Sequence, residues 1–397
     1  MILVKYNTIK MDIFTKDIQE FIDNNYCKDS NNLKEIYDQL YEIYNVKTAS
    51  EKYVIDKNII YYLTEKNKRE TVYEERRIKL NNLKKLKLPD QRTPEWYALR
   101  KKILTASSLA SALDKCHFTT RDELLLGKII EKPYESNPIT EWGVKYEDVA
   151  IMLYEEMNNV KVLDFGLVPH PEFDIFGASP DGICEDLKNG TDDFIARMVE
   201  IKCPPKRKFT KTVPHHYWMQ MQGQLEVCDL DECDFLQVKF EEYENYDEYL
   251  NDRFEIDGVL QDGRTSNNFP KGVVATYKTN DNLVYDYCPL NKSNDDLQKW
   301  INYRKENDID ENKKAENLFE TKYWYITRFE CTLVQRDNQW WNSMIGDILK
   351  FSKDLEYFKT DDNVNILKKR IESSKKRKKR EEPKLLDNFL LLNEDDD

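Results

Sequence analysis

The sequence predicts an α/β protein in which helices flank a central mixed β-sheet, with a helical appendage at the N-terminus. Apolar residues recur at helical spacing in residues 1–90, and helix and strand patterns alternate over about 91–245. A strand and a helix return at 321–334 and 340–358. We therefore expect an appendage over 1–90, a core over 91–358 with an insertion at about 246–320, and a tail over 359–397.

The appendage is predicted from two apolar stripes at helical spacing. The stripes comprise Phe14, Ile18, Phe21 and Ile22, followed by Leu33, Ile36, Tyr37, Leu40 and Tyr44. Pro89 ends the charged stretch that follows. Thr93 and Pro94 then supply an N-cap and a proline at the first helical position, so the core is expected to open with a helix.

The core is expected to alternate helices and strands. The predicted helices are 139–158 and 214–228, and the predicted strands are 162–168, 174–184, 194–203 and 233–240. Residues 246–320 are rich in Asn, Asp and Tyr without a sustained period, so we expect an insertion made of loops.

The composition favours a folded and very polar protein. Charged residues make up 34% of the 397 residues, but 24 Tyr, 17 Phe and 7 Trp suffice to pack a core. No run of about 18 apolar residues occurs, and Lys5, Lys10 and Asp12 interrupt any signal-peptide core. The eight cysteines form no C-x-x-C pair. We expect an intracellular protein with no membrane partner, neither secreted nor membrane-bound.

The charge is unevenly distributed along the chain. The net charge is -13, yet residues 368–380 carry nine basic side chains and one acidic one, so any DNA contact in the body must be local. The basic run 375–380 fits a nuclear address, a DNA tether or a solubilising segment. An apolar patch follows it at Leu385, Leu386, Phe389, Leu390 and Leu391.

Residues 177–204, GASPDGICEDLKNGTDDFIARMVEIKCP, carry the strongest chemical signal. Strand alternation places Glu200 and Lys202 on one face, and the hairpin signal Asn189-Gly190 brings Asp181 opposite Glu200. Two carboxylates and an ammonium on an apolar sheet are costly unless a cation compensates them. Oxygen ligands suit Mg²⁺ or Mn²⁺, and Lys202 can then orient or deprotonate a bound water.

A third carboxylate comes from the helix predicted at 139–158. Glu147 interrupts the apolar stripe of Val144, Ile151 and Tyr154, and its convergence on the cluster would permit a site for two ions. The plainer alternatives are that Glu147 extends to solvent from the helix flank, that S-P-D-G is an ordinary turn, and that E-I-K is a solvated strand edge.

The chain resembles the lambda-exonuclease-like, YqaJ-type viral recombinase nucleases of the PD-(D/E)XK superfamily. The matching segments are Arg100-x6-Ser107, Trp142-Gly143-x3-Glu147, Ser179-Pro180-Asp181-Gly182, Glu200-Ile201-Lys202-Cys203-Pro204 and Tyr217-x2-Gln220-x-Gln222. The resemblance covers about 91–245 and 321–358, and it implies a restriction-endonuclease-like core. The Asn, Lys, Ile and Tyr content would suit a large DNA virus.

The resemblance implies a magnesium-dependent exonuclease that degrades the 5′-ended strand of double-stranded DNA in recombination or repair. By position, Glu147, Asp181 and Glu200 would be metal ligands together with the carbonyl of Ile201. Lys202 would position the water, Gln220 would orient the site, and Arg100, Ser107 and Ser179 would bind the terminal 5′ phosphate. Lys115 and Arg121 are candidates for a second basic residue in that pocket.

Elementary chemistry supports part of the phosphate assignment. Ser107 and Ser108 precede an apolar stretch and are expected at a helix N-terminus, where phosphate is favoured, although serines there are usually only caps. Gln220 and Gln224 share one face of the predicted helix, and Gln222 points elsewhere. The alternative interpretation is that these glutamines only form a polar helix surface.

Two other functions fit the same residues. One is an endonuclease on the same scaffold, and the other is a non-catalytic DNA-binding scaffold for recombination. The resemblance also implies a trimeric ring and a strand-annealing partner, but the sequence fixes no subunit number. Host cytoplasm, viral factory and nucleus all remain open as locations.

Overall fold

The computed structural model divides into two compact units, residues 1–78 and 79–397. It describes residues 15–26, 32–130, 137–187, 192–206, 208–209, 212–278, 283–306, 318–360 and 362–376. None of the helices in these ranges is long and apolar enough to cross a membrane. The predicted tail beyond residue 376, with most of its basic run and its apolar patch, lies outside the described residues.

The first unit is helical, as the apolar stripes predicted. Its described helices are residues 15–25, α2 (Leu33–Ile43) and the N-terminal part of α3 (Ala49–Lys84). These helices bury a small core of Ile18, Ile22, Ile36, Leu40, Ile55 and Ile59. Of the predicted first stripe, Phe14 lies outside the described residues.

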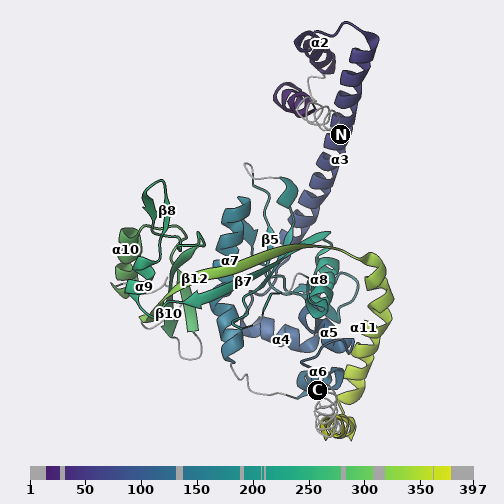
Figure 1. The fold of residues 1–397 in the computed structure, drawn as a ribbon. Coiled ribbons are helices and arrows are strands. Elements are labelled where there is room, and N and C mark those ends of the chain that lie inside the picture. The colour runs from purple at the N-terminus through teal and green to yellow at the C-terminus, as the bar shows by residue number, and fades with distance from the viewer. Residues whose placement is uncertain are drawn as a thin grey trace, which may run out of the picture. The chain divides into compact units, whose positions relative to one another are not determined.

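The second unit is built on a mixed seven-stranded sheet in the order β11-β10-β12-β7-β6-β5-β2 (Figure 1). The pair β6–β7 is parallel and the other described pairs are antiparallel. The strands are β2 (Val162–Leu163), β5 (Gly182–Cys184), β6 (Met198–Lys202), β7 (Glu232–Glu242), β10 (Lys271–Lys278), β11 (Leu283–Tyr287) and β12 (Leu318–Gln335). The predicted mixed α/β architecture is confirmed.

Helices surround this sheet in the second unit. They are α4 (Pro94–Lys102), α5 (Leu109–Ala112), α6 (Arg121–Ile129), α7 (Pro138–Asn158), α8 (His215–Cys228), α9 (Tyr246–Asn251), α10 (Asn294–Glu306), α11 (Asn338–Phe358) and residues 362–376. A small sheet β1-β4-β3 and a hairpin β8–β9 complete the unit. Their strands are β1 (Leu104–Thr105), β3 (Val168–Pro169), β4 (Phe176–Ala178), β8 (Phe254–Ile256) and β9 (Val259–Gln261).

Helices α7 and α8 cover opposite faces of strand β6. Val199 and Ile201 point into the cluster formed with Tyr146 and Leu153 of α7. Because side chains alternate along a strand, Glu200 points to the other face, where α8 lies. This sandwich of helix, strand and helix positions the candidate site.

Several strands of the structure are shorter than the sequence pattern predicted. The predicted strands 162–168 and 174–184 each divide between the two sheets, as β2 and β3 and as β4 and β5. The turn at Ser179–Asp181 separates β4 from β5, since Pro180 has no N–H to donate to a ladder. The predicted strand 194–203 shortens to β6 because Ala196 adopts the left-handed region, at φ 56°.

The stretch predicted as a loop-rich insertion, 246–320, adds two strands to the main sheet. Strand β10 pairs with both β11 and β12, and all but its last residue are buried. A strand buried on both faces shows no alternation of polar and apolar residues, so the sequence pattern missed it.

Candidate functional site

The carboxylate of Glu200 is fully buried on β6 and is held by three side-chain donors. Its Oε1 accepts hydrogen bonds from the ammonium of Lys202 and from Nε2 of Gln220, the latter at 2.7 Å. Its Oε2 accepts from Nε2 of Gln224, also at 2.7 Å. The two glutamines lie one helical turn apart on α8, so both amides reach the same carboxylate. A buried carboxylate is retained only with such compensation.

Gln224 therefore joins the predicted Gln220 as a positioning residue. On the Mg²⁺-dependent nuclease function expected from the sequence, Gln224→Leu should lower the activity about 10- to 100-fold and raise the Mg²⁺ concentration needed for half-maximal activity, since it removes the donor to Oε2. The matched control is Gln222→Leu, because the buried Gln222 bonds to the backbone of Gln335 and Asp337 instead. Equal Mg²⁺ dependence in both variants would show that Gln224 is only structural.

Asp181 sits on the turn between β4 and β5 and points at strand β6. Its Oδ2 accepts a hydrogen bond from the backbone N–H of Ile201 at 2.7 Å. The amide of Gln91 fixes the turn by donating to the carbonyl of Pro180 at 3.0 Å. The next residue must be small, because a Cβ on Gly182 would lie 2.1 Å from Val162 of β2. These contacts bring the two predicted carboxylates, Asp181 and Glu200, to adjacent positions.

The charge of Glu200 shifts the pKa values of both Asp181 and Lys202. Burial raises the pKa of Asp181 well above its ordinary value, and the charge of Glu200 raises it further. Burial alone would lower the pKa of Lys202, but the carboxylates of Glu200 and Asp181 raise it, so Lys202 is an ammonium ion here. The ammonium also lies 5.2 Å from the ring centroid of Tyr217.

Glu147 on α7 lies close to this cluster and forms an ion pair with Arg92. Its Oε1 accepts a hydrogen bond from Nη2 of Arg92 at 2.7 Å. Burial raises the pKa of Glu147, against the opposing effect of Arg92, and Lys202 and Glu200 are both near enough to influence it. Arg92 was not predicted. It stands in the connector before α4 in the left-handed region, at φ 66°, and only its place beside the N-cap Thr93 distinguishes it in the sequence.

The residues present fit a hard divalent cation held by two carboxylates. No three described His, Cys, Asp or Glu side chains converge as a ready-made metal cage. However, when all three are ionised, the carboxylates of Glu147, Asp181 and Glu200 outnumber the cations Arg92 and Lys202 by one negative charge, which a divalent cation would compensate. Oδ2 of Asp181 is used by the Ile201 N–H, which leaves Oδ1 for a metal. The N–H and C=O of a strand residue point to the same side, so the Ile201 carbonyl faces Asp181 as well.

The three residues predicted to bind phosphate are brought together around Trp96. Arg100 donates to Oγ of Ser107 at 3.0 Å, and its guanidinium lies 4.3 Å from the Trp96 ring centroid. The indole N–H of Trp96 donates to Oγ of Ser179 at 2.9 Å. Burial lowers the pKa of Arg100, because the charged guanidinium is partly removed from water, and a bound anion would offset that cost.

Two details of the predicted phosphate pocket change. Ser107 lies in a short 3₁₀ turn and Ser108 is the N-cap residue of α5, so both serines precede a helix as expected, but this helix has only four residues and its dipole contributes little. Arg121, one of the two candidates for a second basic residue of this pocket, forms an ion pair with Asp354 at 2.7 Å. The basic side chain that contacts the segment of Arg100 is Lys128. Its ammonium donates to the backbone carbonyls of Arg100 and Ile103 at 2.8 and 2.7 Å. Burial lowers the pKa of Lys128 to about 8.

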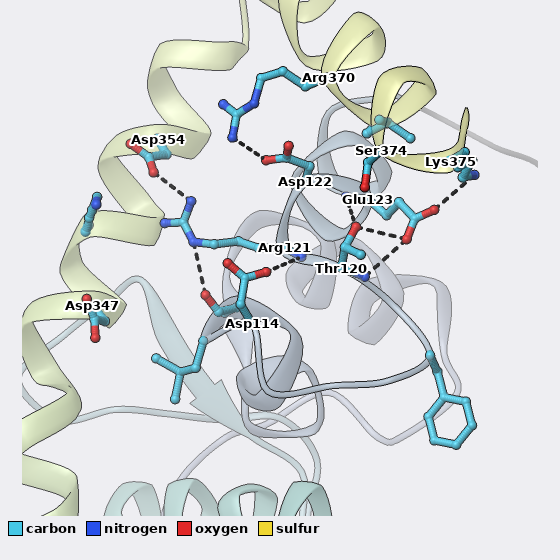
Figure 2. A pocket seen from close by; sticks show the side chains of 15 residues that line it. Asp114, Thr120, Arg121, Asp122, Glu123, Asp347, Asp354, Arg370, Ser374 and Lys375 are labelled. Carbon is cyan, nitrogen blue, oxygen red and sulfur yellow. Dashed lines mark hydrogen bonds and ion pairs between the residues drawn. The ribbon is translucent and has the colours of Figure 1, made fainter. Parts of the chain in front are cut away.

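A separate cavity of about 790 Å³ lies between α6, α11 and the helix 362–376. Ion pairs cross it, as Figure 2 shows: Arg121–Asp354, Arg370–Asp122 and Lys375–Glu123. Of the residues singled out in the sequence, Arg121, a candidate for the phosphate pocket, lines this cavity, and the predicted catalytic and metal-binding residues do not. Because its charges largely neutralise one another, we assign it no chemistry and place the candidate site at Asp181, Glu200 and Lys202.

Comparison with known proteins fits the same part of the chain. The model of the YqaJ-like viral recombinase domain matches residues 95–231. This segment is therefore similar to the YqaJ-like viral recombinase domain. All the predicted site residues, from Arg100 to Gln220, lie within the matched segment, whereas Gln91 and Arg92 precede it.

A relative and two solved structures resemble the chain more broadly. Uncharacterized protein R354 of Acanthamoeba polyphaga mimivirus is 29% identical over 357 residues, which cover 82% of this chain and 64% of that protein. This chain thus spans less than two thirds of that relative's length. An alkaline exonuclease from Laribacter hongkongensis aligns at 19% identity and a TM-score of 0.38, covering 71% of this chain and 99% of its own. A phage related exonuclease from Haemophilus somnus 129PT aligns at 14% identity and a TM-score of 0.33, covering 65% and 93%.

Proposed function

We propose that this protein is a Mg²⁺- or Mn²⁺-dependent deoxyribonuclease that degrades double-stranded DNA from its ends, in the 5′ to 3′ direction, during viral recombination or repair. The observation that carries the proposal is the convergence of Asp181, Glu200 and Lys202: Lys202 donates to Glu200, Asp181 accepts from the backbone N–H of Ile201 between them, and the charges of Glu200 and Lys202 both act on the pKa of Asp181. The similarity to the YqaJ-like viral recombinase domain supports the recombination role.

The residues of the cluster would bind the metal ions and orient the attacking water. Asp181, Glu200 and the Ile201 carbonyl would hold one cation, and Glu147 would serve a second. When bound, such an ion supplies Lewis acidity that favours ionisation of water and stabilises negative charge on phosphate. The Lys202 ammonium can orient the attacking water by hydrogen bonding and offset charge on the phosphate oxygens. Gln220 and Gln224 keep Glu200 in one orientation.

Arg100, Ser107 and Ser179 would hold the terminal 5′ phosphate. We expect Arg100→Ala to lower the ratio of the rates on 5′-phosphorylated and 5′-hydroxyl ends by about 10- to 100-fold, because the variant lacks a charge-assisted contact to the phosphate. Rates on the two kinds of end, measured side by side, provide the test. Lys102→Ala, an exposed neighbour on α4, controls for general loss of positive charge. An unchanged preference in Arg100→Ala would remove this assignment.

The polarity and end dependence are tested by digesting linear duplexes labelled at the 5′ or the 3′ end, alongside covalently closed circular DNA. In Mg²⁺ we expect the 5′-ended strand to shorten from its end, the closed circle to survive and EDTA to stop the reaction. Nicking of the closed circle would identify an endonuclease. DNA binding without cleavage would identify a non-catalytic scaffold. The trimeric state, an annealing-protein partner and an intracellular location remain predictions.

A further inference from the structure

A row of aromatic rings leads from the candidate site to the protein surface. The ring of Tyr217 lies 5.2 Å from the ammonium of Lys202, and the rings of His216 and Tyr217 lie 4.1 Å apart. Phe118 then meets His216 edge to face, at 5.8 Å and 79°. The side of Tyr217 away from this row packs on Phe235 of the sheet. The row is thus anchored at one end and open at the other.

The open end of the row is Phe118, which is 80% exposed. A single exposed phenyl ring is ordinary by itself. Here, however, the ring belongs to the loop between α5 and α6, while His216 and Tyr217 belong to α8. Two segments of the chain about a hundred positions apart are therefore folded together so that their aromatic side chains form one surface.

The helix α8 connects this surface directly to the carboxylate cluster. Tyr217, Gln220 and Gln224 follow one another at i, i+3 and i+7, so they share one face of the helix. The two glutamines bond to Glu200, and the aromatic residues precede them by one turn. A strand whose phosphate lies at Glu200 would thus pass the rings within a nucleotide or two.

The charge around Phe118 is compatible with a DNA strand. The loop Lys115-Cys116-His117-Phe118 exposes a lysine and a histidine beside the ring. Phe118 also lines the cavity described above. Among the acids of that cavity, Asp122, Glu123 and Asp354 are paired with Arg370, Lys375 and Arg121, Asp114 accepts from the backbone N–H of Arg121, and Asp347 is exposed. Exposed rings next to cations are the usual surface for unpaired nucleobases, because every base has a π-face and stacking needs no particular sequence.

We propose that Phe118, supported by His216, stacks an unpaired nucleobase of the strand being cut. The inference rests on the proposed nuclease function and adds a binding site for the base to it. Stacking would hold the end of the strand open beside Lys202. It would therefore favour DNA ends that are already frayed over fully paired ones.

The test uses the full chain in EDTA, so that no cleavage is needed, with duplexes that carry two unpaired terminal nucleotides including 2-aminopurine. The wild-type protein is expected to quench the fluorescence of the probe. Phe118→Ala should bind the frayed duplex about tenfold more weakly and lose most of the quenching. Phe118→Trp should keep both. Because Phe118 is exposed, the alanine variant should melt at the wild-type temperature.

Leu260→Ala provides the matched control, since Leu260 is 51% exposed on the β8–β9 hairpin and outside the row. Absence of quenching by the wild type, or equal quenching by Phe118→Ala, would overturn the stacking proposal. If the Mg²⁺ digestion shows no cleavage while quenching still depends on Phe118, the nuclease function fails and the base site stands. If cleavage occurs and Phe118→Ala quenches like the wild type, the base site alone fails.

Discussion

Lys202→Ala is expected to lower DNA degradation in Mg²⁺ by about a thousandfold or more, and to lower the melting temperature of the metal-free protein, because the buried Glu200 loses its ammonium partner. Lys202 supplies the one described ammonium that bonds to Glu200, and an electrostatic donor in a water-poor site contributes about 10²–10³ in rate. Loss of the ordered water would add to this. Single-turnover rates on a labelled linear duplex measure the effect.

Two further variants separate chemistry from folding at this position. Lys202→Met keeps an apolar stem against Tyr217, so it should be more stable than Lys202→Ala and equally inactive. Lys239→Ala removes a lysine from the neighbouring strand β7, where it pairs with Glu241 at 3.2 Å, and should remain active. Wild-type rates for Lys202→Ala in Mg²⁺ would remove the mechanism.

Asp181→Asn is expected to abolish Mg²⁺-dependent activity and, at the same time, to stabilise the metal-free protein. Asn retains an oxygen to accept the Ile201 N–H, so the local fold is kept. The pKa of Asp181 is raised in the folded state, which means that its charged form destabilises the fold at neutral pH. A neutral side chain of the same shape removes this cost, which we place on the order of 1 kcal/mol.

Thermal unfolding with and without Mg²⁺ tests both halves of this expectation. Mg²⁺ should raise the melting temperature of the wild type, since a ligand that binds only the folded state stabilises it, and should leave Asp181→Asn unchanged. Asp347→Asn, at an exposed position of α11, serves as the control and should behave like the wild type. An Asp181→Asn protein that is less stable than the wild type and still responds to Mg²⁺ would contradict the account.

The parts of the site that local patterns encode were predictable. The alternation of a strand fixes Glu200 and Lys202 on one face of β6. The expected antiparallel pairing of the two flanking strands is confirmed by β5 and β6, although the turn signal Asn189-Gly190 itself lies outside the described residues. The spacing of α8 likewise placed Gln220 and Gln224 on one face, although the second donor to Glu200 was not assigned. These relations depend on neighbours within a single strand, hairpin or helix.

The parts that depend on distant segments were not predictable. Arg92 meets Glu147 across 55 positions of chain, through a connector in an unusual backbone conformation. Lys128 reaches the carbonyl of Arg100 from α6, where nothing marks it among other lysines. Strand β10 is buried on both faces and therefore lacks the period that identifies a strand at the surface.

Anomalous diffraction from crystals of the protein grown with Mn²⁺ tests the central claim most directly. We expect a Mn²⁺ peak between the carboxylates of Asp181 and Glu200, with the Ile201 carbonyl among its ligands and the Lys202 amine beside it. A Mn²⁺ ion bound elsewhere, or no ion at this cluster at a concentration that supports DNA cleavage, would contradict this expectation.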